Sequence, residues 1–482
     1  MACDDENVRF VSVPAGGDCT VGVDVGTTSV KAVAVDARGT VVARARVPHR
    51  VVTPSADLLE HEVARAWRRG PTRAFAEVTA ALDGPPAGVV VTSMVPSITA
   101  VDRRGRPLLP GLLYGDARAN PRGATTGPRA GRDPARPDPG GEREQGRRMV
   151  EWAVREEPGA RGYWNCQAVA THALAGVPGV DMAAAMSFGG LFRKGRWDKV
   201  ALDEVGVDEA QLPVVGPMGG SLGVVPGTPT VFAGGSIDAF CEQIVAGACR
   251  PGDVLVIFGA TLIVWVVTEE WKDIPGLTTL PNMIAGQVMI GGPSNAGGLF
   301  VDWVGSVVAG SPRRSRAMSG PDAGGRTGDP GRIPVWLPYL RGERTPFHDP
   351  GLQASVHGLD ISQGPSSLVR GAYEASGFVI RRILERSGFE GRRIIATGGG
   401  TRSEAWMQAV ADATGLPVET VVVPEGAALG AAFLARMAAG LESSFDAATE
   451  WARSGATSEP DPAWSAAAAE RFEQFEALGP EG

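Results

Sequence analysis

Gly22-Val-Asp-Val-Gly-Thr-Thr-Ser-Val-Lys31 is the stretch from which the fold is best predicted. Two β-branched runs flank a small polar turn at Gly26-Thr27-Thr28, which predicts two antiparallel strands, and residues 41–47 continue the pattern as a third. A glycine that turns backbone N–H groups toward an anion, followed by hydroxyls and a lysine, suits the terminal phosphates of a nucleotide. Asp24 is placed to hold Mg²⁺ through water. The alternative is an ordinary hairpin turn that the aspartate caps.

The opening pattern recurs in the second half of the chain. Residues 254–258 form an apolar run, Gly259-Ala260-Thr261 a tight turn, and residues 262–268 a returning β-branched run. Two hairpins with small hydroxyl-bearing turns predict two similar halves that face one cleft. Coincidence is the competing explanation, because Gly-Thr turns are common.

A glycine-rich turn follows another predicted strand at residues 393–396. It reads Thr397-Gly-Gly-Gly-Thr-Arg-Ser403 and leads into a helix predicted at 404–414. Three glycines allow close backbone approach to a flat or anionic ligand, although the spacing is neither that of a Walker loop nor of the dinucleotide fingerprint. A second small-residue helix, predicted at 425–437, would pack against the first and leave a slot for adenine.

A carboxylate follows a Gly-Gly bend near the middle of the chain. The strand predicted at 230–233 ends in Gly234-Gly235, and Asp238 stands at the start of the next helix. A helix N-terminus keeps such a carboxylate ionised. Phosphoryl transfer to an alcohol needs a base in this state to accept the hydroxyl proton. The ordinary alternative for Asp238 is a helix N-cap.

Size and charge exclude several classes of protein. A chain of 482 residues and 50.0 kDa predicts two or more domains. The net charge of −8 argues against binding to nucleic acid or to an anionic membrane. No stretch approaches the roughly 20 apolar residues of a membrane span, and the acidic start of the chain lacks the features of a signal peptide. Five scattered cysteines fit a reducing compartment. We therefore expect a cytoplasmic protein.

The remaining segments give coarser predictions. Residues 59–82 and most of 149–197 are expected to be helical, and 88–94 to be a buried strand. The stretches 119–147 and 311–332 are dense in Pro, Gly and Arg and are predicted to be mobile surface excursions. The five histidines have no ligand spacing and are interpreted as ordinary surface or core residues.

Taken together and in this order, the motifs resemble the FGGY family of carbohydrate kinases over about residues 20–440. Three further segments carry the resemblance: Tyr114-Gly-Asp-Ala-Arg118, Pro338-Tyr-Leu-Arg-Gly-Glu-Arg-Thr-Pro346 and Glu425-Gly-Ala-Ala-Leu-Gly-Ala-Ala432. The resemblance implies an α/β fold with two actin-like (ribonuclease H-like) domains around an ATP and sugar cleft. A leader over 1–20 would precede a sugar-binding domain over 21–250 and a nucleotide-binding domain over 251–482.

The resemblance also implies the site. Asp238 matches the catalytic base, which also contacts the sugar, and Asp24 matches the carboxylate on the metal side. The residues matched to ATP and its phosphates are Gly26, Thr27, Thr28, Lys31, Gly259, Thr261, Gly399, Gly400 and Ser403. The residues matched to the sugar, besides Asp238, are Met94, Asp116 and Arg118. ATP and Mg²⁺ are the implied cofactors, a small sugar is the implied partner, and a homodimer remains open.

Three departures from the family pattern bear on the activity. Ala260 stands where the second phosphate loop usually carries a hydroxyl, Val95 follows Met94 where the xylulokinase subgroup has a histidine, and Ala239 follows the base where many xylulokinases have Asn. Chain length and the second-half motifs favour a ketopentose, D-xylulose first, over ribulose or a polyol. One alternative is a catalytically impaired regulator that binds nucleotide or sugar. Another is an actin-like ATPase, but that function does not explain the Asp116-Ala-Arg118 segment.

Overall fold

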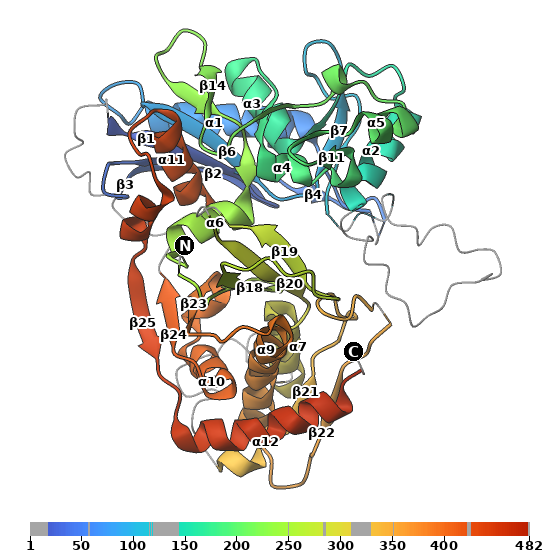
Figure 1. Cartoon of the computed structure of the whole chain (residues 1–482), viewed down its shortest axis with the longest axis vertical. Helices are drawn as coiled ribbons and strands as arrows, with labels where there is room; N and C mark the ends of the chain where they lie inside the picture. The colour runs from blue at the N-terminus through green and yellow to red at the C-terminus, as the bar shows by residue number, and fades with distance from the viewer. Residues whose placement is uncertain are drawn as a thin grey trace, which may run out of the picture. The chain divides into compact units, whose positions relative to one another are not determined.

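The computed structural model describes residues 18–480, except 56–57, 115, 117, 119–143, 249, 283–285, 310–328, 350 and 422–425. The predicted leader (to residue 17) and most of the two Pro/Gly/Arg-rich stretches therefore lie outside the described residues. The chain divides into two compact units (Figure 1). The described part of the first comprises residues 18–118, 144–245 and 426–451, and that of the second 246–421 and 452–480.

The first unit is built on a sheet whose centre is the predicted meander. β1 runs antiparallel to β2, which runs antiparallel to β3; on its other side β1 is parallel to β6, which is parallel to β15 and β16. An antiparallel edge strand, β14, pairs with β15. The strands are β1 (Thr20–Val25), β2 (Ser29–Val35), β3 (Val41–Pro48), β6 (Gly88–Ser93), β14 (Ser221–Val224), β15 (Val231–Ala233) and β16 (Ser236–Ile237).

The second unit repeats this sheet. β17 is antiparallel to β18, which is antiparallel to β20, and β17 is parallel to β23, which is parallel to β24; β25 closes the edge antiparallel to β24. The strands are β17 (Asp253–Phe258), β18 (Leu262–Thr268), β19 (Thr278–Pro281), β20 (Val288–Ser294), β23 (Arg393–Thr397), β24 (Val418–Val421) and β25 (Ser454–Ser458). Because strand directions and neighbours match those of the first sheet, the predicted duplication is confirmed.

The other elements of the first unit are shorter than predicted. The stretch expected to be one helix over 59–82 begins with a short strand and a π-helix, and 149–197 contains strands between its helices. The helices are η2 (Ala64–Arg69, π), α1 (Gly70–Thr79), α2 (Gln145–Glu156), α3 (Cys166–Ala175), α4 (Met182–Met186), η5 (Gly189–Leu191), α5 (Lys199–Val205), η6 (Glu209–Gln211), α6 (Asp238–Ala246), α11 (Ala427–Ala438) and η9 (Phe445–Trp451). The remaining strands are β4 (Val51–Val52), β5 (Glu60–His61), β7 (Ile98–Val101), β8 (Gly111–Leu112), β9 (Gly162–Asn165), β10 (Gly179–Asp181), β11 (Phe192–Arg193), β12 (Arg196–Trp197) and β13 (Val214–Gly216).

Helix α11 lies on the sheet of the first unit, beside β1 and β6 (Figure 1). A Cβ atom at Gly22 of β1 would come within 1.8 Å of the Ala428 carbonyl oxygen, and one at Gly430 within 1.8 Å of the Cys241 carbonyl oxygen. The Thr20 hydroxyl donates to the Ala432 carbonyl at 2.9 Å. The small residues of α11 serve a close approach to strands and to α6 within the first unit. The predicted packing of α11 against 404–414, with a slot for adenine, stays a prediction, because residues 404–414 belong to the second unit.

The second unit holds a buried ionic cluster that joins three helices. Arg370 Nε and Arg471 Nη2 each donate to Glu374 Oε1 at 2.9 Å, and Arg370 Nη2 donates to Asp412 Oδ2 at 2.7 Å. All four side chains are at least 95% buried. The helices of this unit are α7 (Gly298–Ala309), η7 (Pro330–Arg332), α9 (Pro365–Ser387), η8 (Gly399–Arg402), α10 (Glu404–Thr414) and α12 (Pro462–Leu478), and a further strand pair is β21 (Val335–Leu337) with β22 (Ser355–His357).

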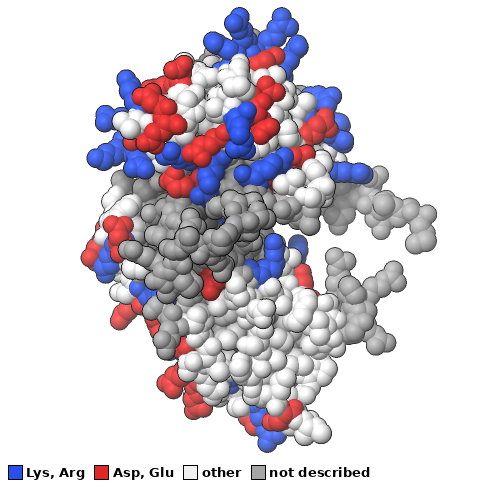
Figure 2. All heavy atoms as spheres, turned by 90° about the vertical axis from the view of Figure 1, so that its right-hand side faces the viewer, with Lys and Arg blue, Asp and Glu red and all other residues white. Residues whose placement is uncertain are grey.

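Acidic and basic side chains intermingle on the surface seen in Figure 2 and form no large field of one sign. Among the described residues, no helix is both long and apolar enough to cross a membrane.

Candidate functional site

The turn between β1 and β2 has the conformation of a tight loop. The Gly26 N–H donates to the Ser29 carbonyl at 3.1 Å, so this N–H closes the turn instead of facing a ligand. Thr27 is half-exposed and Thr28 exposed. Asp24 and Lys31 are directly opposite each other across the two strands. A carboxylate, an ammonium group and two hydroxyls are thus collected at the end of one hairpin.

Two histidines hold the carbonyl groups of this loop. His49 Nε2 lies 2.9 Å from the Gly26 carbonyl oxygen, and His61 Nε2 lies 2.8 Å from that of Thr27. Trp67 Nε1 donates to His61 Nδ1 at 2.9 Å. Because an indole N–H only donates, His61 Nδ1 is the acceptor and its Nε2–H donates to Thr27. The interpretation of these histidines as ordinary residues missed this role.

Electrostatics agree with a neutral His61. Burial lowers its pKa to about 4, outweighing the hydrogen bond to Thr27, which acts in the opposite direction. Burial also lowers the pKa of His49. Both rings are therefore uncharged supports of the loop at neutral pH. No sequence periodicity reveals them, since β5 is only two residues long and Trp67 lies in a π-helix.

Asp238 is brought to the same edge of the sheet as Asp24. β16 pairs with β6 so that Ser236 is opposite Thr92, and Thr92 is opposite Asp24 of β1. Asp238 begins α6 two residues after Ser236. The negative charges of Asp24 and Asp238 both raise the pKa of the buried Cys166 thiol, after the larger effect of burial. The two predicted carboxylates therefore converge around the carboxyl ends of parallel strands.

The strand before Asp238 is fixed by Gln167 of α3. Its Nε2 donates to the carbonyl oxygens of Ser93 and Ser236, each at 3.0 Å. A Cβ atom at Gly235 would come within 2.5 Å of the Gln167 Cβ, and one at Gly234 within 2.3 Å of the Val180 backbone. The Gly-Gly bend thus serves close packing that sets the position of Asp238.

The environment of Asp238 suits a base. Its Oδ1 accepts the Ala239 N–H at 2.7 Å, and burial raises its pKa above the ordinary value of 3.8. Glu242, one turn further along α6, has its pKa raised to about 7, first by burial and then by the charge of Asp238, against the opposing effect of Lys31. Glu242 is a third carboxyl group of this site, after Asp24 and Asp238, and the sequence analysis gave it no role.

Of the residues predicted to contact the sugar besides Asp238, Arg118 is partly exposed, whereas Asp116 and Met94 are buried. Asp116 is fully buried, and its Oδ2 accepts the Leu59 N–H at 2.8 Å and Arg118 Nη2 at 2.7 Å. Arg118 is 20% exposed, also binds Glu60 at 2.8 Å, and lies over the Trp152 ring. Asp116 thus orients Arg118. The Met94 side chain belongs to the core of the unit. Both Asp116 and Met94 are buried, and their predicted contacts with the sugar stay predictions.

In the second unit, two predicted nucleotide loops meet at one sheet edge. β17 and β23 are parallel with Ile257 opposite Thr397, so both loops follow the carboxyl ends of these strands. A Cβ atom at Gly398, whose φ is +92°, would come within 2.7 Å of the Phe258 carbonyl oxygen. This contact sets Gly399 and Gly400 beside the turn that contains Gly259 and Thr261.

Hydrogen bonds from the start of α7 support the 259–261 turn. The Gly259 N–H donates to the Thr261 carbonyl at 3.0 Å, and the Gly259 and Ala260 carbonyls accept the N–H groups of Gly298 and Leu299. Ser403 is instead the N-cap of α10, because its Oγ accepts the Trp406 N–H at 3.3 Å. The predicted contact of Ser403 with ATP stays a prediction.

Comparison with known proteins places the chain among sugar kinases. Residues 19–226 match the N-terminal domain of the FGGY family of carbohydrate kinases, and residues 254–439 match the C-terminal domain of that family. Gluconokinase of Bacillus subtilis is 25% identical, with 89% of each chain covered, and erythritol kinase of Brucella abortus is 26% identical, with 96% of this chain and 94% of that one covered.

A solved structure agrees. The crystal structure of xylulose kinase from Rhodospirillum rubrum superposes with a TM-score of 0.82 at 26% identity, over 95% of this chain and 98% of that one. Both domain matches occur in the expected order, and the duplicated sheet fits the actin-like fold. The chain is therefore a carbohydrate kinase that belongs to the FGGY family.

Proposed function

We propose that this kinase transfers the γ-phosphoryl group of ATP to a hydroxyl of a small ketose, with Asp238 as the general base. The observation that carries the proposal is the convergence of Asp24 and Asp238 at one sheet edge, beside the loop between β1 and β2 and opposite Lys31. A carboxylate whose pKa is raised by burial accepts a proton more readily, and the hydroxyl that loses this proton attacks phosphorus.

The first loop would hold the transferred phosphate. Lys31 supplies positive charge and Thr27 and Thr28 supply hydroxyl donors, while Gly26 allows the turn. A single carboxylate suits Mg²⁺, because this ion keeps several of its waters when a protein binds it. The described residues contain no cluster of three metal-ligating side chains. Asp24 would hold this ion through water, and the ion would neutralise charge that develops on the phosphates.

The loops of the second unit would hold the remainder of ATP. Gly259, Thr261, Gly399 and Gly400 lie together, and their backbone allows a phosphate or a flat base to approach closely. Ala260 provides no hydroxyl, and the loss of one such hydrogen bond costs about 1–3 kcal/mol of binding free energy. The proposed enzyme therefore depends more heavily on Lys31 and the first loop.

D-xylulose is the substrate we propose first. The R. rubrum xylulose kinase covers nearly the whole chain, and Arg118, clamped by Asp116 and Glu60, offers a partly exposed donor for a sugar hydroxyl. Ribulose and polyols are the alternatives, and the gluconokinase and erythritol kinase relatives add a sugar acid and a tetritol to them.

ATP consumption by the purified protein tests the proposal. The panel is D-xylulose, D-ribulose, glycerol, erythritol and D-gluconate, and we expect the highest kcat/KM with D-xylulose. A higher kcat/KM with another compound would make that compound the proposed substrate and would leave the proposed kinase activity unchanged. If none is turned over while ATP binds measurably, the regulator hypothesis gains and the enzyme proposal is lost.

Replacing His61 tests the support of the phosphate loop. His61→Phe fills the space but leaves the Thr27 carbonyl and the Trp67 N–H without their partner. We expect the free energy of unfolding to fall by about 1–3 kcal/mol and the KM for ATP to rise about tenfold. His61→Gln is the matched control, because an amide can donate to Thr27 and accept from Trp67; it should recover most of both values. Equal behaviour of the Phe and wild-type proteins would remove His61 from this role.

A further inference from the structure

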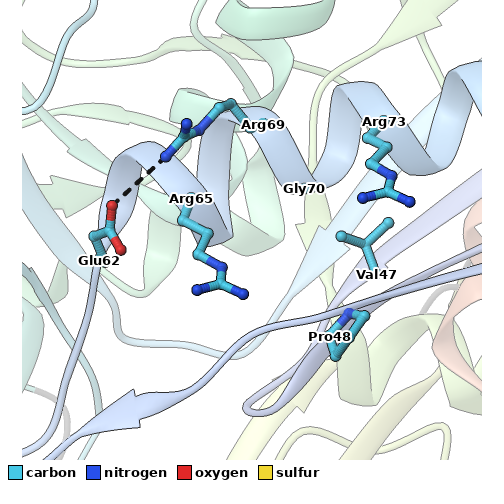
Figure 3. Close-up of a pocket in the computed structure, with 7 residues that line it drawn as sticks. All are labelled: Val47, Pro48, Glu62, Arg65, Arg69, Gly70 and Arg73. Atoms are coloured by element: carbon cyan, nitrogen blue, oxygen red, sulfur yellow. Dashed lines mark ion pairs between the residues drawn. The ribbon is translucent and has the colours of Figure 1, made fainter.

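A cavity of about 480 Å³ lies in the first unit, beside the π-helix η2. Its walls come from the end of β3 and from η2 and α1; the lining residues are Val47, Pro48, Glu62, Arg65, Arg69, Gly70 and Arg73 (Figure 3). Arg65, Arg69 and Arg73 are spaced by four residues along η2 and α1, and all three line the cavity. In Figure 3 the guanidinium groups of Arg65 and Arg73 point toward the strand that carries Val47 and Pro48.

The arginines are only partly neutralised. Arg73 Nε pairs with Glu77 at 2.7 Å, and Arg69 pairs with Glu62 at 3.6 Å, with both of these side chains more than 60% exposed. An ion pair as exposed as that of Arg69 and Glu62 contributes little to the free energy of folding. Among the described residues, no acidic side chain forms an ion pair with Arg65. Like charges four residues apart destabilise a helix, so the three guanidinium groups form a positive lining that an anion would relieve.

The shape and chemistry of the lining define a ligand class. Guanidinium groups match phosphate oxygens with paired N–H donors, and the apolar Val47 and Pro48 side chains leave a surface for a short carbon skeleton. The volume lies within the range of small-metabolite sites. We propose that this arginine cavity binds a small phosphate ester or polyphosphate that carries at least two negative charges, at a site separate from the phosphate loop.

The cavity adjoins the supports of the phosphate loop. Pro48 precedes His49, which contacts the Gly26 carbonyl, and Trp67, on the same π-helix as Arg65 and Arg69, contacts His61. A π-helical turn is rare and often marks a functional site. An anion held by Arg65 and Arg69 would therefore bind to the same helix and strand end that carry the groups contacting the loop.

Isothermal titration at fixed ionic strength tests the site, with inorganic pyrophosphate as the first probe. Lys31→Ala removes the cation of the phosphate loop, so binding by this variant reports on the cavity. Arg65→Ala/Arg69→Ala, added to Lys31→Ala, should weaken the remaining binding at least about tenfold, as expected for the loss of two charge-assisted donors. Arg103→Ala/Arg104→Ala in the same background removes equal charge from an exposed turn of the same unit and should leave the affinity unchanged.

Two results would overturn the site: loss of pyrophosphate binding in Lys31→Ala alone, or unchanged affinity when Arg65 and Arg69 are replaced. ADP and ribose 5-phosphate, titrated into the same variants, distinguish a nucleotide from a phosphorylated sugar as the source of the phosphate. The test needs no turnover, so its failure is separate from a failure of the proposed kinase reaction. Unchanged thermal unfolding of each variant shows that the chain is folded.

Discussion

Asp238→Asn should lower kcat by about 10²–10⁴-fold, the contribution of a positioned general base. Asparagine keeps the shape of the side chain and can still accept the Ala239 N–H, but it cannot take the proton from the sugar hydroxyl. The KM for ATP should change little, because Asp238 is not assigned to the phosphates. Steady-state rates with D-xylulose, or with the best substrate of the panel, give the measurement.

A pH profile adds an independent readout for Asp238. The base works when it is ionised, so kcat/KM should fall as pH falls through its pKa, and burial places that pKa above the 3.8 of an ordinary aspartate. The residual activity of Asp238→Asn should lack this acid limb. Asp198→Asn, at the N-cap of α5, is the matched control, because Asn caps as well as Asp. Full activity in Asp238→Asn would exclude Asp238 as the base.

Glu374→Ala should cost about 3–5 kcal/mol of the free energy of unfolding, since it leaves Arg370 and Arg471 buried without a carboxylate they share. Arg471 would lose its carboxylate partner, and Arg370 would keep only its bond to Asp412. The loss should appear as a lower midpoint of urea unfolding, in the transition of the second unit.

Glu385→Ala provides the control on the same helix. Glu385 pairs with Arg381 at 2.9 Å, also four residues apart, but its side chain is 53% exposed. Its loss should cost no more than about 0.5 kcal/mol. If both variants lose the same free energy of unfolding, burial does not determine how much the ionic cluster contributes to stability. Arg471→Ala in the Glu374→Ala background should recover part of the loss, because it removes the buried charge that Glu374 alone had paired, while Arg370 keeps Asp412.

Local patterns predicted the sheet centre and several helices well. The hairpin around residues 22–31 and its repeat around 254–268 were predictable because neighbouring β-branched runs and glycine turns fix a meander locally. Helix α10 was predicted with the bounds Glu404–Thr414 that the structure gives. The neighbour of α11 was not predictable, since its small residues show only that something approaches closely, and Gly22, which receives it, lies some 400 positions earlier.

The candidate site likewise combines residues that the sequence indicated with contacts that only the structure shows. Strand ends and turn chemistry made Asp24 and Asp238 candidates, and the pairing of β1, β6 and β16 brings them to one sheet edge. Residue type alone could not show that the Asp116 carboxylate accepts hydrogen bonds from Arg118 and Leu59, or that the Met94 side chain belongs to the core. His61 became a site residue only through a contact with a carbonyl group, which a sequence pattern does not record.

The position of α11 also governs when the first unit can form during synthesis. Strands β1 and β6 leave the ribosome early, but the helix that covers their glycine-bearing face is translated after most of the second unit. Until about residue 438 has emerged, this face stays open, and a fragment that stops at residue 250 would expose it permanently. A genetic split of the two units therefore has to supply residues 426–451 with the N-terminal piece, by a second segment or a rearranged chain order.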